Sequence, residues 1–219
     1  MNQEFDAIVI GTGISGGWAA KELCEAGLKT LVLERGRMIR HIVDYHTANM
    51  DPWDFKGGDK TTHEIEKKQY KQIRSTRYAV HESTSHFFVD DNEHPYNEDK
   101  PFDWVRGYHV GGKSLMWARQ VYRLSEFDFE ANAKEGIAID WPIRYKDLAP
   151  WYSYVEKYIG VSGEKLGLPQ LPDSEFLKPM ELTCAEEKFK NEIANKYDDR
   201  LITNARVAHI TEGTKPGLG

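Results

Sequence analysis

The sequence AIVIGTGISG, at residues 7–16, joins a short apolar run to a glycine-rich turn and decides the fold of the N-terminal region. Its first four residues predict a buried strand, and the remaining six follow the pattern G-x-G-x-x-G. In this pattern Gly11 allows a tight turn, Gly13 lets a pyrophosphate approach the backbone, and Gly16 lets the next helix pack on the strand. The free N–H groups at the start of that helix favour phosphate. The stretch therefore predicts a dinucleotide site.

The residues that follow complete the unit expected around such a turn. Residues 17–27 predict a helix, residues 30–33 predict a second strand, and Glu34 ends that strand. The Glu34 carboxylate can accept hydrogen bonds from ribose hydroxyls, and it would repel the 2′-phosphate of NADP. An isolated glycine motif can be an ordinary structural turn, but the strand, helix and acid around this one favour a nucleotide. The motif does not distinguish NAD from FAD.

Composition excludes several other classes of protein. The 219 residues carry a formal net charge of −6, and Lys67-Lys68 is the only adjacent basic pair, so nucleic acid is not expected as a partner. No apolar segment approaches the length of a membrane span. The two cysteines, Cys24 and Cys184, form neither a disulfide framework nor a metal-binding pattern. We expect Cys24 to be a small core residue on the inward side of the first helix.

The start of the sequence also predicts a location. The first apolar run is short and belongs to the nucleotide motif, so it does not read as a cleavable signal peptide. This predicts a cytoplasmic protein, with export together with a signal-bearing partner as the alternative.

The rest of the chain predicts further elements, separated by irregular segments. Residues 36–100 form an irregular insertion with the start of substrate-side elements. Helices are expected at residues 62–75 (charged and exposed), 125–133 (with Ser125 as N-cap), 146–159 and 184–197; strands are expected within 78–89 and at 201–203 and 206–210. The last residues, 213–219, have a loop composition, and we expect the sequence to be the N-terminal part of a longer protein.

Four segments, in this order, together resemble the glucose-methanol-choline (GMC) oxidoreductases, an FAD-dependent family. They are residues 11–36, residues 110–118 (VGGKSLMWA), residues 141–152 (WPIRYKDLAPWY) and residues 204–210 (NARVAHI). The third is the most specific, because it is similar to the family pattern W-P-I-x-Y-x-D-L-x-P-Y-Y. Within the family the sequence looks most similar to bacterial sugar and glycoside dehydrogenases and the gluconate dehydrogenase large subunit.

The resemblance implies a fold and a set of cofactor-binding residues. The fold would be α/β and Rossmann-like, a parallel sheet with helices on both faces, with the substrate domain largely absent. Residues 1–219 would then form one FAD-binding domain, the N-terminal part of a longer GMC-type protein. The cofactor-binding residues would be Gly11, Gly13, Gly16 and Glu34 for the ADP half of FAD, Gly111, Gly112, Ser114, Trp117 and Ala118 along the pyrophosphate and isoalloxazine, and the main chain of Val207 at the adenine. Met116 stands where some relatives carry a flavin-linked histidine, so non-covalent FAD is expected.

The resemblance also implies an activity. The family transfers a hydride from an alcohol to flavin N5, here from a sugar or glycoside, with an undefined electron acceptor and in some cases a partner subunit. The family's catalytic histidine is expected beyond Gly219, so no catalytic residue is assigned. Two alternatives remain open: an NAD-dependent dehydrogenase, which leaves the second and third segments unexplained, and a truncated, non-catalytic flavin-binding fragment.

Several single residues carry weaker hypotheses. His109 can approach a flavin, although a hydrogen-bonded loop histidine is the simpler interpretation. His81 and His86 are not expected to share a metal, and His209 is expected to be exposed. Trp151 and Tyr152 are expected in the core. Arg119 and Arg123 can offset negative charge on the cofactor, or form structural ion pairs.

Overall fold

The computed structural model describes residues 4–213, which form two compact units. The division falls between Trp117 and Ala118. Within residues 4–213, every helix is too short or too polar to cross a lipid bilayer.

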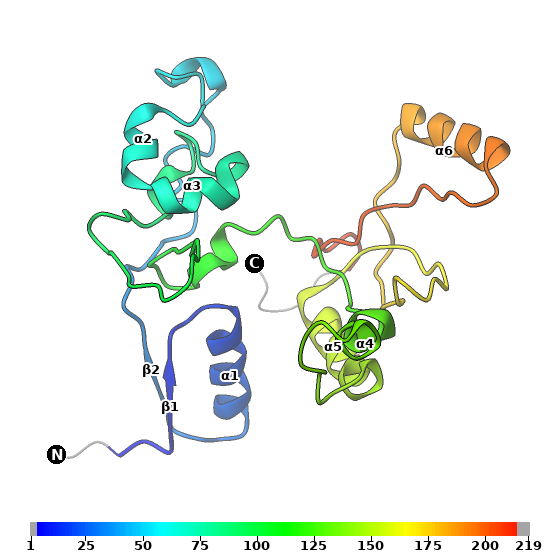
Figure 1. Ribbon diagram of the computed structural model, residues 1–219, viewed down its shortest axis with the longest axis horizontal. Coiled ribbons are helices and arrows are strands. Elements are labelled where there is room, and N and C mark those ends of the chain that lie inside the picture. The colour runs from blue at the N-terminus through cyan, green and yellow to red at the C-terminus, as the bar shows by residue number, and fades with distance from the viewer. Residues whose placement is uncertain (1–3, 214–219) are drawn as a thin grey trace. The chain divides into compact units, whose positions relative to one another are not determined.

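The first unit begins with a small α/β arrangement. Strand β1 (Ala7–Ile10) leads into helix α1 (Ile14–Glu25), and strand β2 (Thr30–Leu33) follows. The two strands are parallel, with Ala7 opposite Thr30 and Ile10 opposite Leu33. Helix α1 packs against both strands (Figure 1). The predicted strand, turn, helix and second strand are therefore confirmed, with the helix beginning at Ile14 rather than Gly17.

The burial of this arrangement is uneven. Val9 is buried, whereas the side chain of Ile10 is 84% exposed and Ile8 is also exposed. Cys24 is exposed as well, so the prediction that it is a core residue is wrong. None of the residues of helix α1 is buried, so Cys24 has no closed core around it within the described residues.

The rest of the first unit is a set of short helices around a small core. Helices α2 (His63–Lys68) and α3 (Tyr70–Thr76) replace the single helix predicted at residues 62–75. Gln69 ends the first and has a non-helical backbone. The helix was expected to be exposed, but Ile73 of α3 is buried with Val80 and Phe88. Short 3₁₀ turns complete the unit: η1 (Pro52–Asp54), η2 (Arg77–Ala79), η3 (Ser85–Phe87) and η4 (Gly112–Leu115).

The strands expected within residues 78–89 do not form. The backbone closes local turns instead: Val80 N–H donates to Arg77 O, and Phe87 N–H donates to Thr84 O. A turn that satisfies its own backbone groups offers no ladder to a neighbouring strand. The loose alternation of apolar residues here reflects contacts with α3 and not a sheet.

The second unit carries three helices at the predicted places. These are α4 (Glu126–Glu135), α5 (Tyr145–Ile159) and α6 (Cys184–Lys196), and Ser125 is the N-cap of α4. Phe129 of α4 is fully buried and meets the ring of Trp141 edge-on. Trp151 is 65% exposed, so its predicted place in the core is wrong, while Tyr152 is half-buried. Trp151 lies on the solvent side of α5.

The two C-terminal strands predicted at residues 201–203 and 206–210 are also absent. Val207 forms isolated bridges with Gln120 and Ser162, and no ladder extends from them within the described residues. His209 is half-buried rather than fully exposed. Arg206 interrupts the apolar pattern, because its buried guanidinium donates to Pro172 O and to the Asp173 carboxylate.

Candidate functional site

The first glycine turn has the geometry that the sequence predicts. Gly11 has a φ of +89°, a left-handed conformation that favours glycine, and its N–H donates to Leu33 O at 2.7 Å. A Cβ on Gly16 would lie 1.9 Å from the carbonyl oxygen of Gly11, so helix and turn touch there. A Cβ on Gly13 would meet no protein atom within 4 Å. The space in front of Gly13 is therefore open to a ligand.

Glu34 lies at the end of β2 and points back to this turn. Its Oε2 accepts hydrogen bonds from the Thr12 N–H at 2.8 Å and the Thr12 hydroxyl at 2.6 Å. Its Oε1 accepts from the Gly36 N–H at 2.8 Å. These bonds, first of all that of the Thr12 hydroxyl, lower the pKa of Glu34 to about 2. The carboxylate is therefore ionised and held in one orientation at neutral pH.

The second glycine turn lies directly against the first. Gly111 and Gly112 have φ values of +92° and +54°, and the Ser114 hydroxyl donates to Gly111 O at 2.7 Å. The Gly111 N–H donates to the Thr12 hydroxyl oxygen at 3.0 Å. A Cβ on Gly112 would lie 3.1 Å from the Cα of Gly13. Two motifs nearly a hundred residues apart thus form one structure.

A short backbone pairing holds the second turn in place. The N–H of Arg37 donates to Tyr108 O at 3.3 Å, and the Val110 N–H donates to Arg37 O at 2.9 Å. A Cβ on Gly36 would lie 2.1 Å from the backbone nitrogen of His109, so only glycine fits at this crossing. On the other side of the turn, Met116 packs against the core of Ile73, Val80 and Phe88. The segment after β2 therefore positions both turns.

The remaining three predicted cofactor residues are divided between the two units. Trp117 is exposed at the end of the first unit, while Ala118 and Val207 belong to the second unit. The N–H of Val207 donates to Ser162 O, and its carbonyl accepts from the Ser162 N–H. The structure thus brings together seven of the ten predicted residues (Gly11, Gly13, Gly16, Glu34, Gly111, Gly112 and Ser114).

Thr12 is the residue of the site that sequence reasoning missed. It occupies the variable position between Gly11 and Gly13, which the motif leaves unspecified. A hydroxyl at that position, with an acid at the end of the next strand, is the signal that could have revealed it. In the structure this one side chain contacts Glu34 and the second glycine turn.

His109 is 2% exposed beneath the second turn. Its Nε2 lies 3.3 Å from Phe87 O, and its Nδ1 is buried without a hydrogen-bond partner. Burial lowers the pKa of His109, so the ring is neutral at pH 7. This agrees with a hydrogen-bonded loop histidine.

Other titratable groups also have structural partners. His81 Nδ1 lies 3.0 Å from an Asp59 carboxylate oxygen. Within residues 4–213, no three His, Cys, Asp or Glu side chains are placed to bind one metal ion. Arg123 forms a buried ion pair with Glu156, the structural alternative left open by the sequence. Arg119 has a φ of +60° and is exposed.

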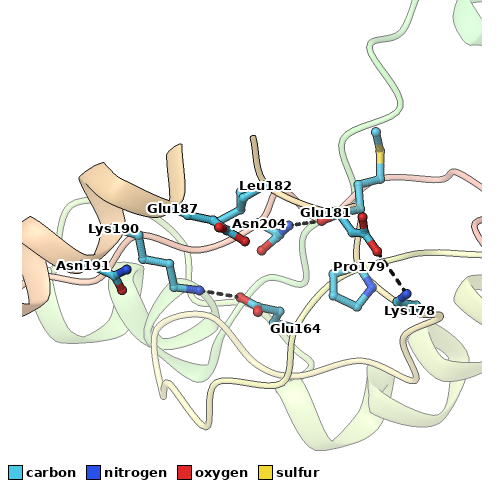
Figure 2. Close-up of a pocket in the computed structure, with 10 residues that line it drawn as sticks. Glu164, Lys178, Pro179, Glu181, Leu182, Glu187, Lys190, Asn191 and Asn204 are labelled. Atoms are coloured by element: carbon cyan, nitrogen blue, oxygen red, sulfur yellow. Dashed lines mark hydrogen bonds and ion pairs between the residues drawn. The ribbon is translucent and has the colours of Figure 1, made fainter. Parts of the chain in front are cut away.

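The second unit contains a separate pocket of about 550 Å³ beside α6 (Figure 2). Four of its charged residues form two ion pairs: Lys190 with Glu164 at 3.6 Å, and Lys178 with Glu181 at 3.4 Å. None of the predicted site residues lines it. The glycine turns, with their open approach and oriented carboxylate, are therefore the stronger candidate site.

Curated proteins similar to this chain are redox enzymes. The gluconate 2-dehydrogenase flavoprotein of Pantoea cypripedii is 27% identical over 173 residues, which are 74% of this chain and 26% of that protein. The 2-methyl-1,2-propanediol dehydrogenase of Mycolicibacterium austroafricanum is 30% identical over 77% of this chain and 26% of its own length. The fructose dehydrogenase large subunit of Gluconobacter japonicus is 28% identical over 72% of this chain and 27% of its length.

These similarities cover most of this chain but only a part of each relative. The chain spans about a quarter of the length of the curated relatives it matches. No protein-family model matches the chain. Over about three quarters of its length the chain is similar to GMC-type oxidoreductases, as its four motifs indicate.

Proposed function

We propose that this chain binds FAD non-covalently, in a Rossmann-like site, and forms the flavin-binding part of an oxidoreductase that acts on CH–OH groups. The single observation that carries the proposal is the contact between the two glycine turns through Thr12. A site for NAD needs only the first turn and its acid. FAD has the same pyrophosphate as NAD but is longer beyond it, by the ribityl chain and the isoalloxazine ring. A second glycine turn beside the first gives that longer cofactor a further stretch of backbone that it can approach closely.

The residues present fit the ADP half of FAD. Gly13 leaves its approach open, and α1 begins at the next residue with N–H groups that have no intrahelical partner. Glu34 accepts three hydrogen bonds from the protein, while an ionised carboxylate offers about four acceptor positions. This oriented carboxylate is the proposed acceptor for a ribose hydroxyl. The negative charge of Glu34 would repel a 2′-phosphate.

On the flavin side, the proposal assigns Gly111, Gly112 and Ser114 to the approach of the pyrophosphate, with Trp117 and Ala118 further along. Val207 remains a proposed adenine contact, although its main-chain groups already pair with Ser162. When bound, the flavin would accept the hydride of the substrate's carbinol carbon. The residues of this chain bind and orient the cofactor, and none of them is assigned as the base.

The class of substrate follows from the relatives. Gluconate, fructose and a diol appear in the names of three of them, so the proposed donor is a sugar, a glycoside or a related polyol. One relative is named a large subunit, which supports a partner subunit for this protein too. Reduction of an artificial electron acceptor by the protein expressed from the complete reading frame, with a panel of sugars, glycosides and simple alcohols, tests this level of the proposal, because no residue of residues 1–219 is assigned as the base. Turnover with none of them would contradict it.

The cofactor is tested directly on purified protein. The protein is denatured, the supernatant is chromatographed beside FAD, FMN and NAD standards, and the mass of the polypeptide is measured. We expect free FAD in the supernatant and an unmodified polypeptide, because Met116 cannot form the covalent link. Recovery of NAD alone would overturn the choice of cofactor, and a flavin-sized mass increase would overturn the non-covalent attachment.

A further inference from the structure

Thr12 makes an unusual set of contacts for a residue in a glycine turn. Its hydroxyl donates to Glu34 Oε2 at 2.6 Å and accepts from the Gly111 N–H at 3.0 Å. Its backbone N–H donates to the same carboxylate oxygen at 2.8 Å. The hydroxyl thus uses its single proton on one partner and a lone pair on the other. No other side chain in the described residues contacts both Glu34 and Gly111 by the hydrogen bonds of the structure.

The two bonds reinforce each other. A hydroxyl that donates to an ionised carboxylate is polarised, and its oxygen then accepts more strongly from an N–H. The N–H of Gly111 needs this acceptor because the left-handed backbone of Gly111 turns that segment toward the first glycine motif. Gly112 is also close to the first turn, because a Cβ added to Gly112 would lie 3.1 Å from the Cα of Gly13. Loss of the hydroxyl would leave both Glu34 and Gly111 with one bond fewer at the same point.

We infer that Thr12 is a positioning residue that couples the two glycine turns, so that Glu34 is oriented for the ribose only while the second turn is in place. The inference deepens the proposed FAD site and rests on it. Either half of the site then depends on the other, although the two motifs lie far apart in the sequence. The sequence motif itself assigns no role to this position.

Three variants separate the hydroxyl from the shape of the side chain. Thr12→Val keeps the β-branched shape and removes the hydroxyl, and Thr12→Ser keeps the hydroxyl. Thr30→Val is the matched control, because the Thr30 hydroxyl donates only to the nearby Leu28 carbonyl. We expect Thr12→Val to weaken FAD binding about tenfold or more, which is about 1.4 kcal/mol. Thr12→Ser and Thr30→Val should bind FAD as the wild type does.

A double-mutant cycle tests the coupling to Glu34. FAD affinity is measured by fluorescence titration for the wild type, Thr12→Val, Glu34→Gln and the double variant. Since Thr12 acts through Glu34, the loss caused by Thr12→Val should be much smaller when Glu34 is already Gln. A pH series gives a second test. As the pH is lowered, the FAD affinity of Thr12→Val should begin to decrease at a higher pH than the FAD affinity of the wild type does. The reason is that the Thr12 hydroxyl is the main cause of the low pKa of Glu34.

The outcomes distinguish this inference from the proposed function. Wild-type protein that binds no FAD would overturn both. FAD binding by the wild type with equal affinity in Thr12→Val would overturn the inference and leave the proposed function standing. Additive losses in the cycle, or a loss in Thr12→Ser as large as in Thr12→Val, would also overturn it. Non-additive losses rescued by serine would support it.

Discussion

The second unit is stabilised by a buried ion pair whose removal should be costly. The Arg123 guanidinium donates from Nε to both Glu156 oxygens, at 3.0 and 3.2 Å, and from Nη2 to Oε2 at 2.5 Å. The side chains of Arg123 and Glu156 are only 5% and 3% exposed. Burial disfavours the charged form of Arg123, but the hydrogen bonds to Glu156 and Tyr145 outweigh it and raise the pKa of Arg123. Arg123 is therefore charged in the folded protein.

Replacing Glu156 with Leu leaves Arg123 buried without its counter-charge. Breaking a buried pair in this way costs about 3–5 kcal/mol. For a unit of this size that corresponds to a fall in melting temperature of at least about 12 °C. The Ser174 hydroxyl, which also donates to Glu156, loses its acceptor too. The double variant Arg123→Met with Glu156→Leu removes both charges, so it should lose less stability than Glu156→Leu alone.

The assay is equilibrium unfolding in urea, followed by tryptophan fluorescence, since Trp141 and Trp151 both lie in this unit. The replacement of Lys157 with Met is a control, because Lys157 is exposed and only loosely paired with Glu175 at 3.8 Å. A loss below about 1 kcal/mol for Glu156→Leu would refute the argument. A double variant less stable than Glu156→Leu would also refute it, because the cost would then not come from an unpaired charge.

Three further predictions follow from the first unit. Gly16→Ala should destabilise the protein by about 1–3 kcal/mol in urea unfolding, because the new Cβ would lie 1.9 Å from Gly11 O; an unchanged midpoint would contradict this close contact. Burial, with the nearby His46, lowers the pKa of His86 to about 4 from 6.5. The neutral His86 ring therefore contributes its full stabilisation above pH 6.5, and this contribution is lost as the pH falls to about 4. His86→Leu should make the unfolding free energy less dependent on pH between about 4 and 6.5. The pKa of Glu34 is about 2 instead of 4.5, so its contribution is complete above pH 4.5 and is lost between pH 4.5 and 2; Glu34→Gln should flatten that lower window and leave the upper one unchanged.

The glycine motifs were predictable from the sequence because each glycine has a local reason. Gly11 needs a positive φ, and Gly16 needs the absence of a Cβ, and both requirements are visible in a short stretch of sequence. The helices were predictable for a similar reason, since an N-cap such as Ser125 and a glycine such as Gly160 mark their ends. Contacts between neighbours in sequence thus account for most of what was predicted.

The parts that failed depend on distant residues. Apolar alternation within residues 78–89 indicated strands. These residues instead form turns that pack on α3, and no local sequence pattern predicts those turns. Trp151 and Cys24 were assigned to the core from helical periodicity, which shows the apolar side of a helix but not whether another segment covers it. The role of Thr12 depends on Gly111, 99 residues away, so the motif could not reveal it.

The open approach in front of Gly13 is the proposed FAD site, and the Gly13→Val variant places a side chain in that space. Gly13 has a φ of −63° and a ψ of −177°, which other residues adopt, and a Cβ there meets no protein atom within 4 Å. The free energy of unfolding of Gly13→Val should therefore differ from that of the wild type by no more than about 1 kcal/mol.

The measurement is a titration of cofactor-free wild type and Gly13→Val with FAD, and with NAD for comparison, beside their unfolding curves. We predict that the wild type binds FAD in preference to NAD, and that Gly13→Val is folded but binds FAD at least about 100-fold more weakly, about 2.7 kcal/mol. A folded Gly13→Val that binds FAD as tightly as the wild type would contradict the account, and so would a wild type that prefers NAD.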